Sequence, residues 1–197
     1  MDYYKSRGSQ DHRTIRQIEQ PLFNKQFYTS KENIKEVYKR IKYKRKRHIN
    51  PLNNTYLTKE QFNEYFKFTI VRNPWERSYS WYKNVIRDET HLKNHQVSNE
   101  ITFNDFIKLY AGKGMLRPQL YWLKDFRGEI NFDLIGRFET LNKDFKLISE
   151  KLNLASVVLP HKLKGSTFDY KSQFTKESID LIAKIYKEEI KLFDYSF

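Results

Sequence analysis

A short segment near the middle of the sequence has residue types and spacing suited to holding an anion. Arg72 can donate two parallel hydrogen bonds, and Asn73-Pro74 is a pair typical of the first turn of a helix. The first amide groups of a helix have no partner within it and carry partial positive charge, so they favour a bound anion. Ser80 lies about two turns further on and can present its hydroxyl to the same anion. The spacing indicates a phosphate site, with an ordinary strand-to-helix connection as the alternative.

The elements that must position these residues are a strand before them and a helix after them. Residues 67–71 are β-branched and aromatic, which predicts a buried strand, and the helix is expected to run to residue 87. Residues 131–135 predict a second buried strand. Strands that alternate with helices indicate an α/β fold with a small, largely parallel sheet, whose ligands bind beyond the carboxyl ends of the strands. The site is therefore expected near residues 72–80.

Further helices are predicted from capping residues and apolar spacing. A capping box at Thr58 opens a short helix, and Thr102 opens another that should stop near Gly112. A helix is expected after Gly136, with Leu141, Phe145, Ile148 and Leu152 on one face. Thr175 caps a single carboxyl-terminal helix with one apolar stripe, made of Ile179, Ile182, Ala183, Tyr186, Ile190 and Phe193.

Composition limits the classes of protein that this chain can belong to. Its 197 residues suit one domain, and 37 Lys and Arg against 24 Asp and Glu give a net charge of +13. That charge favours an anionic partner: nucleic acid, anionic lipid, a nucleotide cofactor or a sulfated sugar. The absence of cysteine excludes disulfide frameworks, thiolate metal sites and cysteine nucleophiles. The five His and the acids show no metal-ligand spacing, so we expect no metal.

Neither a membrane span nor a signal peptide is expected from the hydropathy pattern. No window approaches 18 uncharged apolar residues, and residues 1–20 are polar with acids among the bases. Together with the lack of cysteine, this favours a cytoplasmic setting. We find no repeat and no second domain, so residues 1–197 are interpreted as a single domain.

A strongly basic stretch at residues 35–48 has two interpretations. Ile34, Val37, Tyr38 and Ile41 recur at helical spacing around it, so we interpret it as a solvated helix whose narrow apolar stripe faces the core. A nucleic-acid or phosphate arm is the alternative. No RNA-recognition or zinc-finger spacing accompanies it, which argues against a nucleic-acid partner.

The segment around Arg72 resembles a known family. Residues 65–82, YFKFTIVRNPWERSYSWY, resemble the signature of the sulfotransferases that use 3′-phosphoadenosine-5′-phosphosulfate (PAPS), especially the carbohydrate-modifying branch. Residues 132–139, FDLIGRFE, resemble a second family segment, and residues 159–166, LPHKLKGS, resemble the late loop that closes over the nucleotide. Residues 185–197 look like the family's terminal helix, so the resemblance covers roughly residues 58–197 and leaves residues 1–57 poorly matched.

The resemblance implies a P-loop-like nucleotide-binding fold and transfer of a sulfuryl group from PAPS to a hydroxyl or amine, with a glycan as the expected acceptor. In the family, the Arg at Arg72 and the Ser at Ser80 bind the cofactor's 3′-phosphate. The closing loop would add Lys164, Gly165 and Ser166 to the nucleotide site; a basic surface loop is the alternative. The same resemblance places Arg117 and Gln119 near the acceptor. Gln119 could equally be a structural hydrogen-bonding residue.

An earlier family element is not found in this sequence. The family has a first strand and a glycine-containing loop that hold the 5′-phosphosulfate, whereas the only upstream glycine here is Gly8. We therefore expect that strand and its loop to be missing from this chain. Residues 11–19, DHRTIRQIE, do resemble the stretch that follows the loop, which makes His12 the candidate catalytic base; a plain surface histidine is the alternative.

Two other functions stay open at this point. A catalytically inactive relative would keep the 3′-phosphate half of the site and hold a nucleotide or an anionic polymer. A basic nucleic-acid-binding protein would be built around residues 35–48.

Overall fold

The computed structural model describes residues 12–19, 28, 30–46, 56–154, 159 and 169–197. The chain groups into two compact units: Met1–Lys67 with Leu120–Asp133 form the first, and Phe68–Gln119 with Leu134–Phe197 form the second. Whether the whole chain acts as a single domain stays a prediction.

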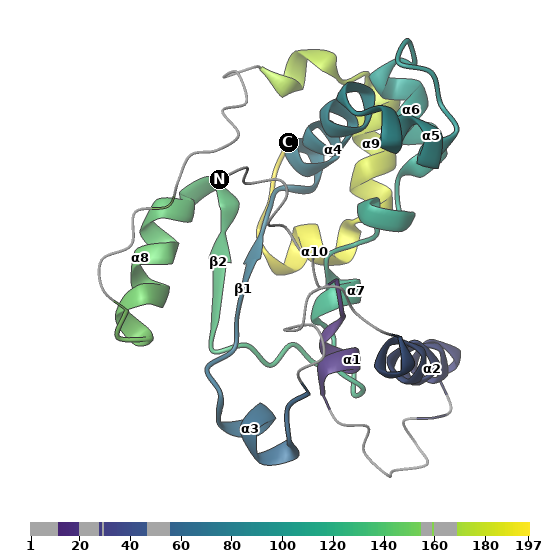
Figure 1. The fold of residues 1–197 in the computed structure, drawn as a ribbon. Coiled ribbons are helices and arrows are strands. Elements are labelled where there is room, and N and C mark those ends of the chain that lie inside the picture. The colour runs from purple at the N-terminus through teal and green to yellow at the C-terminus, as the bar shows by residue number, and fades with distance from the viewer. Residues whose placement is uncertain (1–11, 20–27, 29, 47–55, 155–158, 160–168) are drawn as a thin grey trace, which may run out of the picture. The chain divides into compact units, whose positions relative to one another are not determined.

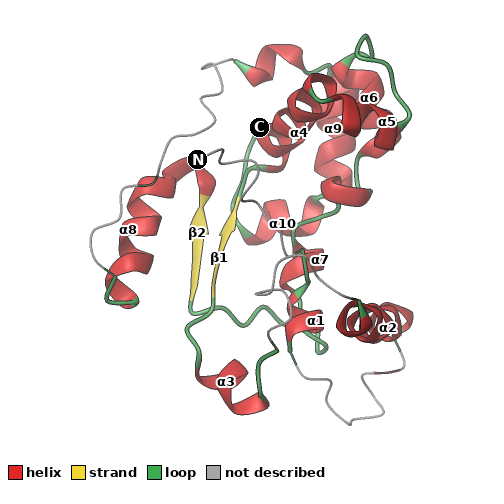
Figure 2. Ribbon diagram, in the orientation of Figure 1, coloured by secondary structure: helices red, strands yellow, loops and turns green. Residues whose placement is uncertain are grey.

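The fold is α/β and rich in helix, with a small parallel sheet (Figure 2). The first unit holds helices α1 (Ile15–Ile18), α2 (Lys31–Arg45), α3 (Lys59–Glu64) and α7 (Leu120–Leu123). The second unit holds strands β1 (Phe68–Val71) and β2 (Leu134–Arg137), and helices α4 (Pro74–Arg87), α5 (Glu89–His95), α6 (Phe103–Tyr110), α8 (Leu141–Lys151), α9 (Lys176–Ile185) and α10 (Lys187–Leu192). Short 3₁₀ turns cover Gly114–Leu116, Phe138–Thr140 and Tyr170–Gln173.

The sheet of the second unit pairs β1 with β2 in parallel, from Phe68 opposite Leu134 to Val71 opposite Arg137. Helix α8 follows β2 and packs beside it (Figure 1). Gly136 permits this packing, because a Cβ there would lie 2.7 Å from Ile70 Cδ1 and 3.0 Å from Asp144 Cβ. The prediction of a strand before Arg72 is confirmed, but the second strand begins at Leu134 rather than at residue 131.

Local capping signals give the helix starts that the sequence predicts. In α3, the Thr58 hydroxyl accepts from the Gln61 amide at 3.1 Å, and the Gln61 carboxamide oxygen accepts from the Thr58 amide at 3.0 Å. Thr102 caps α6 in the same way through the Asp105 amide. Helix α6 ends before Gly112, whose φ of +78° suits glycine.

The carboxyl-terminal helix differs from its prediction. A single helix with one stripe was expected, but α9 ends at Ile185 and α10 begins at Lys187. Tyr186 between them is fully buried, and its hydroxyl donates to the Leu116 carbonyl and accepts from the Gly112 amide. The chain turns at Tyr186 to reach those partners, which a sequence pattern does not reveal.

Helix α2 also differs from its prediction. Its apolar residues Ile34, Tyr38 and Ile41 were expected on the core, yet all three are exposed. The buried residues of the helix are Asn33 and Glu36 instead. Hydrogen bonds to Asn33 and Glu36 hold α2 in the first unit, and of the four residues of the predicted stripe only Val37 is half-buried.

Candidate functional site

The site predicted around Arg72 lies in the second unit, where β1 gives way to α4. Val71 is buried at the end of the strand, and the chain leaves the sheet through Arg72 and Asn73. The Asn73 side chain accepts a hydrogen bond from the Trp75 amide at 3.0 Å, and Pro74 takes the first position of the helix. The strand, turn and helix predicted from these residues are confirmed.

The guanidinium group of Arg72 is fixed by three neighbours. Its Nη1 donates to the Ser80 hydroxyl at 3.0 Å, and its Nη2 donates to the Glu76 carboxylate at 2.8 Å. The ring of Phe138 lies below it, with the guanidinium carbon 4.1 Å from the ring centroid. Arg72 and Ser80, predicted from spacing to serve one anion, are therefore in direct contact.

One donor of this guanidinium is left over. Arg72 Nε is buried and donates to no described atom, while the side chain as a whole keeps 22% of its surface exposed. A buried donor without an acceptor costs free energy, and an incoming anion would supply the acceptor. The group is thus both held in place and reachable from solvent.

A second layer of side chains fixes the backbone of Arg72. The Gln119 carboxamide accepts from the Arg72 amide at 2.9 Å and donates to the Arg72 carbonyl at 2.8 Å, as a neighbouring strand would. Gln119 is held in turn by Glu189, which is fully buried and accepts from both its side chain and its backbone amide. These bonds give Gln119 a positioning role toward Arg72; its predicted contact with an acceptor stays a prediction.

The first amides of α4 are partly occupied by the protein itself. The Asn73 amide donates to the Glu139 carboxylate at 2.6 Å, and the Trp75 amide donates to the Asn73 side chain. Glu139 thus supplies a negative charge at the helix start, where the sequence suggested room for a ligand's charge. The ability of this β1–α4 connection to bind an anion therefore depends on Arg72 and Ser80 more than on the first amides of α4.

Residues 195–197 also contact the connection between β1 and α4 and stabilise it. The Asn73 side-chain amide donates to the Ser196 carbonyl at 2.8 Å, and the rings of Trp75 and Phe197 meet edge to face at 5.9 Å. The Tyr195 hydroxyl donates to Glu139 at 3.4 Å, and burial together with that carboxylate raises the pKa of Tyr195. Tyr195 is therefore neutral and able to donate at ordinary pH.

The remaining predicted site residues fall in different places. His12 is exposed and precedes α1 in the first unit, and Arg117 is half-buried in the second unit with its carbonyl accepting from Arg77. Lys164, Gly165 and Ser166 lie outside the described residues, as does Gly8. Within the second unit, the structure brings Arg72, Ser80 and Gln119 together.

Some residues of the site were missed by the sequence reasoning. Glu76 is four residues after Arg72 and meets it as an (i, i+4) ion pair, so the helical spacing alone could have found it. Phe138 and Glu189 approach from distant parts of the sequence and carry no local signal.

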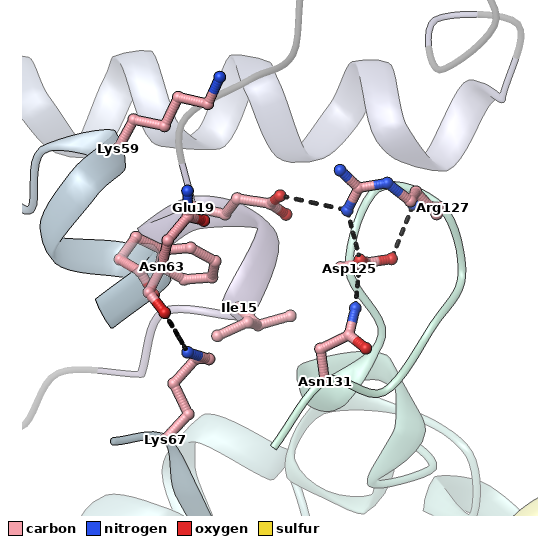
Figure 3. A pocket seen from close by; sticks show the side chains of 9 residues that line it. Ile15, Glu19, Lys59, Asn63, Lys67, Asp125, Arg127 and Asn131 are labelled. Carbon is pink, nitrogen blue, oxygen red and sulfur yellow. Dashed lines mark hydrogen bonds and ion pairs between the residues drawn. The ribbon is translucent and has the colours of Figure 1, made fainter. Parts of the chain in front are cut away.

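A separate cavity of about 380 Å³ lies within the first unit (Figure 3). Arg127 stands between two buried carboxylates there, 3.0 Å from Asp125 and 3.7 Å from Glu19. Burial raises the pKa of Glu19, and the negative charge of Asp125 adds to the effect. Of the predicted site residues that the structure describes, none lines this cavity.

Comparison with known proteins gives the lineage of the chain. The model of the sulfotransferase family matches residues 13–196. The chain belongs to the sulfotransferase family. The match takes in the first unit as well, including the stretch after His12 whose likeness to the family the sequence suggested. It thus extends well beyond residues 58–197, where the resemblance was clearest.

A sulfotransferase relative is similar over much of this chain. Carbohydrate sulfotransferase 10 of Xenopus laevis is 26% identical, in an alignment that covers 69% of this chain and 49% of the relative. The chain therefore spans about half the length of that protein. No solved structure matches the chain.

Two further observations concern the part of the chain that the structure describes. Each of its helices is too short or too polar to traverse a lipid bilayer. Its His, Asp and Glu side chains form no group of three or more that could hold a metal ion.

Proposed function

We propose that this chain transfers a sulfuryl group from PAPS to a hydroxyl group of a carbohydrate. The observation that supports it most is the contact between Arg72 and Ser80 at the end of β1, within the segment that most resembles the family signature. Membership of the sulfotransferase family and the likeness to a carbohydrate sulfotransferase support the reaction and the acceptor class.

The residues around Arg72 fit the 3′-phosphate of such a nucleotide. The unused Nε donor and the Ser80 hydroxyl can both donate to phosphate oxygens, and Phe138 holds the plane of the guanidinium. Glu76 neutralises part of the positive charge, so binding an anion means sharing the guanidinium with that carboxylate. Because Arg72 is already fixed, little side-chain entropy is lost when the anion binds.

PAPS would supply the sulfuryl group, and adenosine 3′,5′-bisphosphate would be the nucleotide product. Transfer of such a group depends on positioning and on positive charge at the bridging oxygen, together with a base for the acceptor hydroxyl. We assign the base to His12, and acceptor contacts to Arg117. Lys164, Gly165 and Ser166 are assigned to the nucleotide as further parts of the proposal.

Calorimetry with adenosine 3′,5′-bisphosphate tests the nucleotide site. We expect Arg72→Ala to weaken binding by about 10- to 100-fold, because a charged donor is lost, and Ser80→Ala to weaken it by less than about tenfold. Arg87→Ala is the matched control, since Arg87 is exposed near the other end of the same helix and its Nη2 donates to the nearby Asn84 side chain at 3.2 Å. Unchanged affinity in Arg72→Ala would refute the site.

Turnover separates the enzyme from its alternatives. Transfer of labelled sulfate from PAPS to a panel of oligosaccharides is expected in the wild-type chain and lost in His12→Ala, with nucleotide affinity kept. Nucleotide binding without any transfer would favour an inactive relative. Salt-dependent RNA or DNA binding without nucleotide binding would favour a nucleic-acid-binding protein.

A further inference from the structure

Helix α2 presents apolar side chains to solvent on one face. Ile34, Tyr38 and Ile41 keep 50%, 66% and 45% of their surfaces exposed, although they recur at the spacing of a core-facing stripe. Three large apolar residues on one exposed helix face form a patch rather than scattered surface residues. A contiguous apolar patch of this kind is a candidate interaction surface.

The orientation of α2 is fixed by the opposite, polar face. Glu36 is fully buried and accepts hydrogen bonds from Thr14, Gln17, Lys39 and Tyr121. Asn33 is buried beside it and bonds to Arg16 and to the Phe126 carbonyl. Turning the helix to bury the apolar stripe would break all of these bonds, so the stripe stays outside.

Positive charges flank the stripe. At 100° per residue, Lys31, Lys35, Lys42 and Arg45 fall on the same side of the helix as Tyr38, and all four are exposed. The two acids of the helix do not offset them on that side, because Glu36 is buried and Glu32 pairs with Arg16. We call these four cations, together with Ile34, Tyr38 and Ile41, the α2 outer face.

We propose that the α2 outer face docks on the surface of a bilayer that contains anionic phospholipid. The helix would lie in the plane of the interface, with its isoleucines and tyrosine at the acyl boundary and its lysines among the headgroup phosphates. This inference is independent of the sulfotransferase reaction and does not involve a membrane-spanning helix.

Lipid suits this face better than the other anionic partners do. A nucleic acid or a sulfated glycan would use the cations and Tyr38, but would leave the two isoleucines in water. A stable protein interface buries about 800 Å² on each partner, with aromatic and Arg anchors. One face of a 15-residue helix, with three lysines and one arginine, is smaller and better matched to fluid headgroups.

Vesicle binding by the full chain tests the proposal. We expect sedimentation with vesicles of phosphatidylcholine and phosphatidylserine, little with phosphatidylcholine alone, and a steep loss of binding as salt is raised. Lys31→Glu/Lys35→Glu/Lys42→Glu should weaken binding at least about 100-fold, since each cation near the surface contributes about fivefold. Ile34→Ser/Tyr38→Ser/Ile41→Ser should weaken it at least about tenfold.

Matched control variants test whether vesicle binding depends on the α2 outer face or only on the total charge and the total exposed apolar surface of the chain. Lys143→Glu/Lys146→Glu/Lys151→Glu makes the same charge change on exposed positions of α8. Leu109→Ser/Leu147→Ser/Leu154→Ser removes comparably exposed apolar side chains elsewhere. Equal losses in a test variant and its control overturn the proposal. Binding that survives the triple serine change on α2 also overturns it, because only charge would then be involved.

A labelling experiment keeps the question answerable if a triple variant misfolds. The chain has no cysteine, so Tyr38→Cys can carry a single environment-sensitive fluorophore. Its emission should shift to the blue with anionic vesicles, whereas the same label at Leu147→Cys should not respond. No shift at position 38 overturns the proposal. Two other results also overturn the proposal. One is a dimer of the wild-type chain, detected by light scattering, that dissociates when the three serine substitutions are made. The other is binding to RNA without binding to vesicles.

Discussion

Helices α4 and α2 are nearly equal in length, with 14 and 15 residues, but they bury opposite kinds of side chain. Helix α4 buries Trp75, Tyr79 and Val85, whereas α2 buries Asn33 and Glu36. Apolar packing tolerates small shifts of a helix, because it has no direction. A buried hydrogen-bond network fixes rotation and position together. The two helices should therefore respond differently to the same substitution.

The largest effect is expected where the polar face of α2 is broken. Glu36→Leu keeps the size of the side chain but leaves Lys39, Tyr121 and two further donors without their acceptor. We expect a loss of about 3 to 5 kcal/mol in the free energy of unfolding, measured by urea denaturation. Glu64→Leu, at an exposed position of α3, is the control and should change it by less than about 0.5 kcal/mol. A tolerated Glu36→Leu would mean that α2 packs like α4.

A matched pair of truncations sharpens the comparison at a smaller scale. Val85 on α4 is fully buried, so Val85→Ala should cost about 2 kcal/mol through lost apolar burial and a small cavity. Ile41 on α2 is half-exposed, and Ile41→Ala should cost less than about 0.5 kcal/mol although it removes a larger side chain. Equal costs in urea denaturation would contradict the orientation of α2.

The smallest effect is expected at Glu19, another buried carboxylate of the first unit. Its pKa is raised by burial and by Asp125, so the folded state takes up a proton more readily than the unfolded chain. Stability should then fall as pH rises from the unfolded pKa through the folded one. Glu19→Gln is expected to raise the melting temperature at neutral pH and to weaken this dependence. Glu89→Gln, on an exposed residue of α5, is the control for the loss of one carboxylate.

The pH response of Glu36 should have the opposite sign. Burial alone would raise the pKa of Glu36, but hydrogen bonds from Lys39, Tyr121 and Thr14 outweigh it and hold the pKa below its ordinary value. Its contribution to stability is therefore present above the unfolded pKa and is lost as pH falls through the folded pKa. Acid unfolding of the wild type should thus be steeper than that of Glu36→Gln; equal slopes would contradict this assignment.

A structural feature could be predicted from the sequence when the residues that contact one another lie close together in the chain. The corner at Arg72 was predictable because the Asn73 cap, Pro74 and Ser80 lie within nine residues of the strand end. The face of α2 was not, since the partners of Glu36 include Thr14 and Tyr121, which are 22 and 85 residues away. The break between α9 and α10 at Tyr186 was not predicted, for the same reason. The Tyr186 hydroxyl bonds to Leu116 and Gly112, which lie 70 and 74 positions earlier in the sequence.

The candidate site also has one part that the sequence predicted and another that it did not. The pair of Arg72 with Ser80 followed from helical spacing and from the resemblance to the family. The hydrogen bonds between Arg72 and Gln119 and between Gln119 and Glu189 join residues that are 47 and 70 positions apart in the sequence, respectively. No local sequence pattern predicts these bonds. The roles of His12 and Arg117 toward an acceptor stay predictions.

The contacts of Ser196 and Phe197 with Asn73 and Trp75 have a practical consequence for anyone who purifies this protein. Deleting Ser196 and Phe197, or replacing Phe197 with a small side chain, would loosen the contacts that support the cap of α4. Either change would disturb the connection between β1 and α4 without altering Arg72 or Ser80. Handles for immobilisation are better attached on the exposed side of α8, for example at Lys146.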